Sequence, residues 1–142
     1  MIFQEQEIDR VFCDTSFFYA CLDNRDVHHA RARTLVEDAA TAHVVFYSTW
    51  DIVSETVTLL CYHCNYARAL AFLDHVKPAL RLVAYDDSIR HHAEDVFRRL
   101  GRDKKLSLCD TLSFVVVTML LDDIVCLSFD RDFKQLGLTV LS

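Results

Sequence analysis

Short apolar runs alternate with longer amphipathic segments along most of the chain. The apolar runs predict strands at residues 10–13, 44–47, 80–84, 124–129 and 138–141. The segments between them predict helices at residues 15–22, 28–40, 49–63, 66–77, 86–100 and 110–121. Strands that are apolar throughout, rather than at alternate positions, are typical of a parallel sheet covered by helices on both faces. The pattern therefore predicts an α/β fold.

Polar residues and turn formers mark several ends of these helices. Asp14 is placed to cap the helix that follows the first strand, and Pro78 ends the helix over 66–77. Gly101 is predicted to be the residue just after the helix over 86–100. The chain has only two Gly and one Pro, which argues against an all-β design with many tight turns.

The length and composition favour one domain that covers residues 1–142. Hydrophobic residues make up 52% of the chain, enough for a sizeable core. The longest apolar run, 112–121, is half as long as the roughly 20 residues that a membrane span needs. The polar, acidic start of the chain does not resemble a secretion signal. We therefore expect a cytoplasmic protein with no membrane contact.

Four acidic residues occupy positions that a parallel sheet would bring together. Asp14 and Asp130 each follow a predicted strand directly, and Asp110 opens the most apolar helix. Glu55 borders the buried face of the helix over 49–63. Taken singly, each acid also fits a helix cap, a turn or a surface position. Functional sites of such folds lie beyond the carboxyl ends of the strands, however, so these four are the candidate site.

Carboxylates gathered in one pocket repel each other, and a hard divalent cation relieves that repulsion. No Cys or His accompanies the four acids at ligand spacing, so Mg²⁺ or Mn²⁺ fits better than zinc. Cys61 and Cys64 form half of a zinc pattern, but no second pair follows to complete the four ligands that a structural zinc needs. Metal-assisted hydrolysis of phosphodiester bonds uses a site of this composition.

At these positions the chain resembles the PIN-domain ribonucleases, and particularly the VapC-type toxins of toxin–antitoxin pairs. The resemblance covers nearly the whole chain, and it depends on the order and spacing of five short segments. These segments are Val11-Phe-Cys-Asp14-Thr-Ser, Asp26-x-His28, Ser48-Thr followed by Glu55, Leu108-Cys-Asp110-Thr-Leu-Ser-Phe, and Ser128-Phe-Asp130-Arg-Asp-Phe133.

The resemblance implies a three-layer α/β/α fold with a central parallel sheet and a Mg²⁺- or Mn²⁺-dependent endoribonuclease activity. Water would attack the phosphorus directly and leave a 5′-phosphate and a 3′-hydroxyl. The resemblance also implies a homodimer and an antitoxin partner whose tail enters the acidic pocket. Two alternatives stay open: a housekeeping PIN nuclease that processes RNA, and a catalytically idle PIN domain that binds RNA or protein.

The resemblance also assigns roles to residues of this chain. The catalytic acids would be Asp14, Glu55, Asp110 and Asp130. The metal ligands would be Asp14, Asp110 and Asp130, with Asp132 as an alternative for the last. The hydroxyl of Thr15 or Ser16 would support the metal shell.

Outside this set, a basic strip and several aromatic residues are secondary candidates. Residues 98–105 carry a local charge of +4, so the rest of the chain carries −10. Within this strip Arg102, Lys104 and Lys105 are predicted to contact the RNA backbone; a solvated helix end is the alternative. His28, like the other histidines in charged segments, is predicted to be a solvated surface residue. The rings in the segment 17–19 are predicted to lie in the core rather than to stack on bases.

Overall fold

Five parallel strands form the central layer of the computed structural model, which describes all 142 residues. Their order is β3-β2-β1-β4-β5, with β1 in the middle. The strands are β1 Arg10–Cys13, β2 Val45–Ser48, β3 Arg81–Leu82, β4 Val125–Leu127 and β5 Val140–Leu141. All four neighbouring pairs run parallel. The predicted α/β fold with a central parallel sheet is therefore confirmed.

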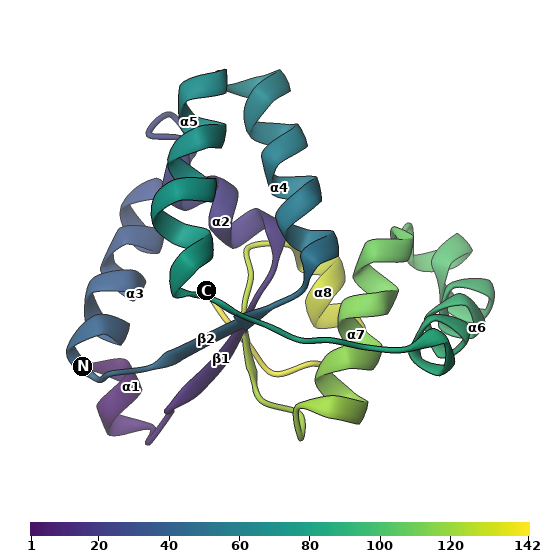
Figure 1. Ribbon diagram of the computed structural model, residues 1–142. Coiled ribbons are helices and arrows are strands. Elements are labelled where there is room, and N and C mark those ends of the chain that lie inside the picture. The colour runs from purple at the N-terminus through teal and green to yellow at the C-terminus, as the bar shows by residue number, and fades with distance from the viewer.

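Helices cover both faces of the sheet (Figure 1). α1 and α3 lie on one side and α6 and α7 on the other, while α4 and α5 lie side by side and extend beyond the sheet. The helices are α1 Ile2–Glu5, α2 Thr15–Leu22, α3 His29–Thr41, α4 Trp50–His63, α5 Tyr66–Ala71, α6 Asp87–Lys104, α7 Leu108–Leu120 and α8 Arg131–Gln135. A π turn over Phe72–Val76 and a 3₁₀ turn over Lys77–Ala79 follow α5. None of these helices combines the length and the apolar character that crossing a membrane requires.

The central strand is apolar because helices bury both of its faces. Val11, Phe12 and Cys13 have no exposed surface, and they belong to the one large cluster of buried apolar side chains. Phe17 and Phe18 of α2 join the same cluster, which confirms the prediction that these rings are core residues. The strand therefore fixes the position of its last residue, Cys13, and of the next residue, Asp14, at the carboxyl edge of the sheet.

The prediction that Gly101 ends a helix is wrong. α6 continues through Gly101 and ends at Lys104, and the left-handed residue that follows is Lys105, with φ of 53°. A Cβ on Gly101 would lie 2.9 Å from Cδ2 of Phe97, so the glycine makes room for that ring. The short helices α1 and α8 were not predicted, because a single turn leaves too few positions for a hydrophobic period.

A capping box fixes the start of α7 and, with it, the side chain of Asp110. The Ser107 hydroxyl accepts a hydrogen bond from the Asp110 amide at 3.0 Å, and Oδ2 of Asp110 accepts one from the Ser107 amide at 3.0 Å. Each bond satisfies a backbone N–H that a helix start leaves without a partner. The helix therefore begins at Leu108, two residues before the predicted start.

We expect Ser107→Ala to lower the free energy of unfolding by about 1 kcal/mol, because the Asp110 amide loses its cap. Urea denaturation followed by circular dichroism measures this difference. Ser107→Asn is the matched control, since its side chain caps the same amide and should keep most of the stability. Equal losses in the two variants would show that the cap does not stabilise the helix.

Candidate active site

The candidate site lies at the carboxyl edge of the sheet, where the strand order reverses. From β1 the chain first builds β2 and β3 on one side, and later builds β4 and β5 on the other. Asp14 follows β1 directly, and its amide donates to the carbonyl of Leu127, the last residue of β4. In parallel sheets a ligand site forms at such a switch point, because the loops from the two strands diverge there.

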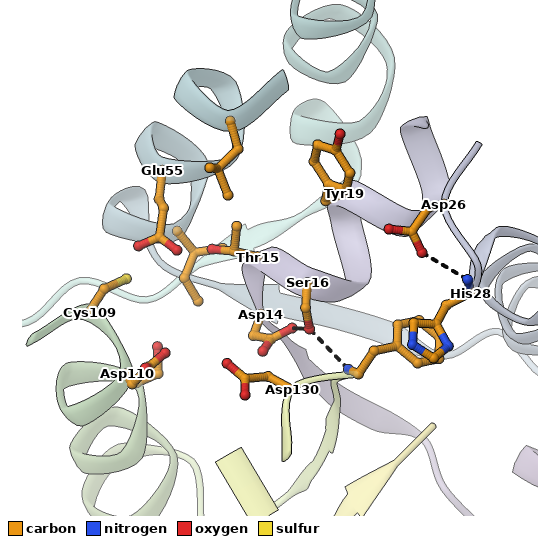
Figure 2. A pocket seen from close by; sticks show the side chains of 14 residues that line it. Asp14, Thr15, Ser16, Tyr19, Asp26, His28, Glu55, Cys109, Asp110 and Asp130 are labelled. Carbon is orange, nitrogen blue, oxygen red and sulfur yellow. Dashed lines mark hydrogen bonds between the residues drawn. The ribbon is translucent and has the colours of Figure 1, made fainter. Parts of the chain in front are cut away.

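A cavity of about 310 Å³ opens at this edge, and all four predicted acids line it. Figure 2 shows the carboxylates of Asp14, Glu55, Asp110 and Asp130 around the same space. They come from four parts of the chain: the end of β1, the middle of α4, the first turn of α7 and the loop after β4. The structure thus brings together acids that are more than 100 residues apart; their catalytic role stays a prediction.

Asp14 is the most buried of these acids, with 5% of its surface exposed. Its Oδ1 accepts hydrogen bonds from the Ser16 hydroxyl at 2.7 Å and from the Phe17 amide at 3.1 Å. Its Oδ2 accepts one from the Ser128 hydroxyl at 2.6 Å. Burial raises the pKa of Asp14 to about 6, although these three hydrogen bonds act to lower it. The carboxylate is therefore held in one orientation and is ionised at a cost to the folded state.

Asp110 and Cys109 occupy the opposite wall of the cavity. Burial raises the pKa of Asp110, while the hydrogen bonds from Ser107 act to lower it. Burial also raises the pKa of the Cys109 thiol, and the nearby carboxylates of Glu55 and Asp110 raise it further. The thiol is therefore neutral, and a neutral thiol is neither a good nucleophile nor a good metal ligand. On this wall the carboxylates, and not the thiol, are therefore the candidate reactive groups.

The sequence left Asp130 and Asp132 as rivals for the fourth acid, and the structure separates them. Asp130 lines the cavity, whereas Asp132 does not. Asp130 caps the short helix α8, and its Oδ1 accepts a hydrogen bond from the Asp132 amide at 2.9 Å. This cap places Asp132 in the first turn of α8, away from the cavity. The geometry thus favours Asp130.

Ser16 and Ser128 hold the carboxyl edge together around Asp14. The Ser16 hydroxyl donates to Asp14 and accepts a hydrogen bond from the Phe129 amide at 2.9 Å (Figure 2). The Ser128 hydroxyl donates to Asp14 and accepts one from the Asp130 amide at 3.0 Å. Thr15 also lines the cavity, but its hydroxyl makes no hydrogen bond to the protein. Of the two hydroxyls that the sequence offered as support, Ser16 is therefore the one that positions Asp14.

The donor set tests whether a divalent cation fits this cavity. No three Asp, Glu, His or Cys side chains converge closely enough to hold a metal ion together, and the six cysteines are free thiols. A structural zinc site needs ligands that converge in this way, whereas Mg²⁺ retains several waters and needs only one or two carboxylates. The open arrangement of carboxylate oxygens around a cavity of this size fits Mg²⁺ or Mn²⁺.

Several cavity residues were not singled out as site residues from the sequence. His28 is exposed as predicted, but it also lines the cavity and stacks its ring on Phe129. Asp26 and Tyr19 line the same side. The positions of Asp26 and His28 depend on the path of the loop between α2 and α3, which no periodicity predicts. Ser113 could have been predicted from the sequence, because it lies three residues after Asp110 and so shares its helix face.

The predicted basic contacts lie away from the cavity. Arg102, Lys104 and Lys105 are at the end of α6, which packs against α7, and none of them lines the cavity. Arg98 of the same strip forms ion pairs with Glu94 and Asp95 on its own helix. The RNA-binding role of the strip therefore stays a prediction.

Comparisons with known proteins agree with this fold. The family model described as the PIN domain matches residues 11–138. A search of curated proteins found no match. Among solved structures, that of VapC20 from Mycobacterium tuberculosis, described as a sarcin–ricin loop cleaving toxin, is similar with a TM-score of 0.79. It is 25% identical over 91% of this chain and 96% of the other.

Two further structures share the fold at lower identity. FitAcB from Neisseria gonorrhoeae is 13% identical with a TM-score of 0.65, over 93% of this chain and 96% of the other. VapBC2 from Rickettsia felis, bound to a DNA fragment from their promoter, is 10% identical with a TM-score of 0.63, over 93% and 97%. The structural neighbours are therefore VapC and FitB toxins of toxin–antitoxin systems.

The raised pKa of Asp14 predicts how the metal-free protein responds to pH. Because the folded state holds this proton more tightly than the unfolded state, the stability from Asp14 falls as the pH rises from about 4 through about 6. Asp14→Asn removes the ionisable group and should raise the free energy of unfolding in EDTA at pH 8 by about 3 kcal/mol at most. The gain should shrink steadily towards pH 4.

Thermal or urea unfolding in EDTA across this pH range measures the difference between the two proteins. Asp122→Asn is the matched control, because Asp122 is exposed and its φ of 53° suits Asn. A variant at position 14 that is no more stable than the native protein at pH 8 would show that the buried charge is not destabilising.

Proposed function

Because this chain belongs to the PIN-domain family, we propose that it is a metal-dependent endoribonuclease and the toxin of a toxin–antitoxin pair. One observation carries the proposal: four carboxylates from separate parts of the chain surround one cavity at the carboxyl edge of the sheet. RNA is supported as the substrate by the likeness to VapC20, which is described as a toxin that cleaves the sarcin–ricin loop.

In this proposal Asp14, Asp110 and Asp130 would hold the Mg²⁺ or Mn²⁺ ion, partly through the waters that such an ion retains, and Glu55 lines the same cavity from α4. Such a cation polarises the scissile phosphate and lowers the pKa of a bound water. Asp14 enters the reaction already oriented, because the Ser16, Ser128 and Phe17 hydrogen bonds fix both of its oxygens. No reorganisation of this carboxylate is then needed when the substrate binds.

Water is the proposed nucleophile. The one thiol in the cavity, Cys109, is held neutral by burial and by its acidic neighbours. The Ser16 hydroxyl is already committed to Asp14. In the proposal the Glu55 carboxylate accepts a proton from the attacking water. The new bond joins water oxygen to phosphorus as the bond from phosphorus to the 3′ oxygen breaks. The 3′ oxygen takes a proton from solvent, so the products are a 5′-phosphate and a 3′-hydroxyl.

The buried charge of Asp14 argues against the idle alternative. A domain that only bound RNA or protein would be more stable with a neutral residue at this position, since burial raises the pKa of the carboxyl to about 6. A bound cation would offset that cost by favouring the ionised form. The retained carboxylate therefore fits a site that is filled by metal.

An antitoxin and a homodimer complete the proposal. The structural neighbours are toxins of toxin–antitoxin systems, which supports a partner protein for this chain. An Arg or Lys side chain of the antitoxin would neutralise the cavity acids and compete with the metal. The homodimer is taken from the family resemblance.

The first test of the proposal is RNA cleavage by the purified protein. Total cellular RNA incubated with Mg²⁺ should give discrete fragments, and EDTA should prevent them. Asp14→Asn and Asp130→Asn should reduce the cleavage rate by more than the roughly 10- to 100-fold that loss of an outer-shell partner costs. Asp132→Asn is the matched control and should cleave nearly as fast as the native protein, because Asp132 lies outside the cavity.

Two results would contradict this assignment. Fragments that persist in EDTA would exclude a metal-dependent reaction. If Asp132→Asn lost activity and Asp130→Asn kept it, Asp132 rather than Asp130 would be the fourth acid.

The basic strip gives a separate prediction about affinity. Lys104→Ala/Lys105→Ala should reduce the slope of log K against log salt by about 1.4 if each lysine contacts one phosphate of single-stranded RNA. Filter binding at several salt concentrations measures the slope. Arg68→Ala/Arg81→Ala is the matched control, since these exposed cations form no ion pair and lie on α5 and β3. An unchanged slope in the lysine variant would leave the strip as a solvated helix end.

A further inference from the structure

Three aromatic rings form a column that runs from the core to the rim of the acidic cavity. Phe17, 1% exposed, stacks on Phe129 with ring centroids 6.1 Å apart and an angle of 20°. Phe129 stacks on His28 with centroids 4.4 Å apart and an angle of 3°. His28 is exposed and ends the column. Phe129 covers one face of the imidazole, and a further ring would extend the stack on the opposite face.

Hydrogen bonds hold this column in a fixed position relative to the acids. The His28 amide donates to Oδ1 of Asp26 at 2.8 Å, and the Phe129 amide donates to the Ser16 hydroxyl at 2.9 Å (Figure 2). The same Ser16 hydroxyl donates to Asp14. The ring of His28 is thus connected to the carboxylate of Asp14 through Phe129 and Ser16.

A second cavity, of about 200 Å³, lies against the column and is lined by two positively charged side chains. It shares His28, Phe129 and Asp130 with the acidic cavity, so the two cavities are neighbours. Arg131 and Lys134 of α8 line only the second one. Both side chains are exposed, and neither forms an ion pair or a side-chain hydrogen bond in the protein. Ser128 and Ser142 complete the lining.

We propose that this second cavity and the column bind the nucleotide next to the cleaved bond. The base stacks on the free face of His28, and the phosphate lies between Arg131 and Lys134. Bases stack on aromatic rings with little regard to sequence, because every base has a π face. A guanidinium and an ammonium with no protein partner are suited to a phosphate. The inference rests on the proposed nuclease function and names a substrate subsite for it.

A single-stranded RNA fits these features better than an acidic peptide does. Carboxylates of a peptide would match the two cations, but they would leave the stacked His28 ring unused. A nucleotide provides a planar base and a phosphate together. The shared rim also places this nucleotide directly beside the acids that act on the neighbouring phosphate.

The test measures RNA binding separately from cleavage. The full chain with Mg²⁺ is titrated into a fluorescent single-stranded oligoribonucleotide whose phosphorothioate linkages resist hydrolysis, and anisotropy is read. His28→Ala should weaken binding about tenfold, as expected for one base–aromatic stack. His28→Phe is the matched control, since it keeps a ring and should bind within about twofold of the native protein. Thermal melting verifies that both variants fold, as expected for an exposed position.

The two cations are tested by salt dependence. Arg131→Ala/Lys134→Ala should reduce the slope of log K against log salt by about 0.7, because the two cations neutralise one phosphate of the single strand. Arg68→Ala/Arg81→Ala removes the same charge from exposed positions outside both cavities and should leave the slope unchanged.

Four outcomes would overturn the subsite. These are a native protein that does not bind the oligoribonucleotide, a His28→Ala variant that binds as tightly as the native protein, a His28→Phe variant as weak as His28→Ala, and an unchanged slope without the two cations. Displacement of the RNA by polyglutamate of equal charge, as effective as displacement by unlabelled RNA, would assign the surface to an acidic polypeptide instead.

The two proposals fail in different ways. If the native protein and His28→Ala cleave ordinary RNA with Mg²⁺ at the same rate, the nuclease proposal is supported and the subsite proposal is rejected. If the protein binds the oligoribonucleotide in a way that depends on His28 but cleaves no RNA, the subsite proposal is supported and the nuclease proposal is rejected.

Discussion

A single buried carboxylate, that of Asp14, links the fold of this protein to its candidate chemistry. It lies directly after the central strand, where both neighbouring strands fix the backbone. Its two oxygens accept hydrogen bonds from α2 and from the loop after β4, so it joins elements that are far apart in the chain. Burial nevertheless raises its pKa to about 6. The protein thus keeps a charge where a neutral side chain would be more stable, which is typical of functional sites.

The sequence predicted the sheet because its signal is local and strong. β1 from Val11 to Cys13 and all of β4 are apolar, and in a parallel sheet covered on both faces this is the pattern that burial requires. α1 and α8 escaped notice because one helical turn carries no period. Gly101 was misinterpreted for a different reason: glycine suits a helix end, but here it makes room for Phe97 within a helix. Phe97 and Gly101 lie one turn apart on the same helix face, and the sequence alone does not show that the Phe97 ring turns towards the glycine.

The site was predictable to the extent that strand ends determine it. Asp14 and Asp130 follow strands, so their meeting at one edge follows from the topology. The choice between Asp130 and Asp132 depends on α8, since the residue that caps this helix lies at the cavity and the next acid turns away. Asp26 and His28 lie in a loop whose course is set by tertiary contacts. His28 in particular is held by its stack on Phe129, a contact across 101 positions of the chain that no local pattern reveals.

The net charge of −6 raises the question of how such a protein would approach RNA. Charges farther away than about 8 Å are largely screened at physiological salt, so the residues around the cavity determine the local field. Several cations are already paired within their own helices, as Arg98 is with Glu94 and Asp95. Arg131 differs, because it follows Asp130 directly and yet forms no ion pair with it, while Oδ1 of Asp130 is occupied by the Asp132 amide. The α8 cap thus holds Asp130 at the rim that the two cavities share, and it leaves Arg131 without an ion-pair partner at the second cavity.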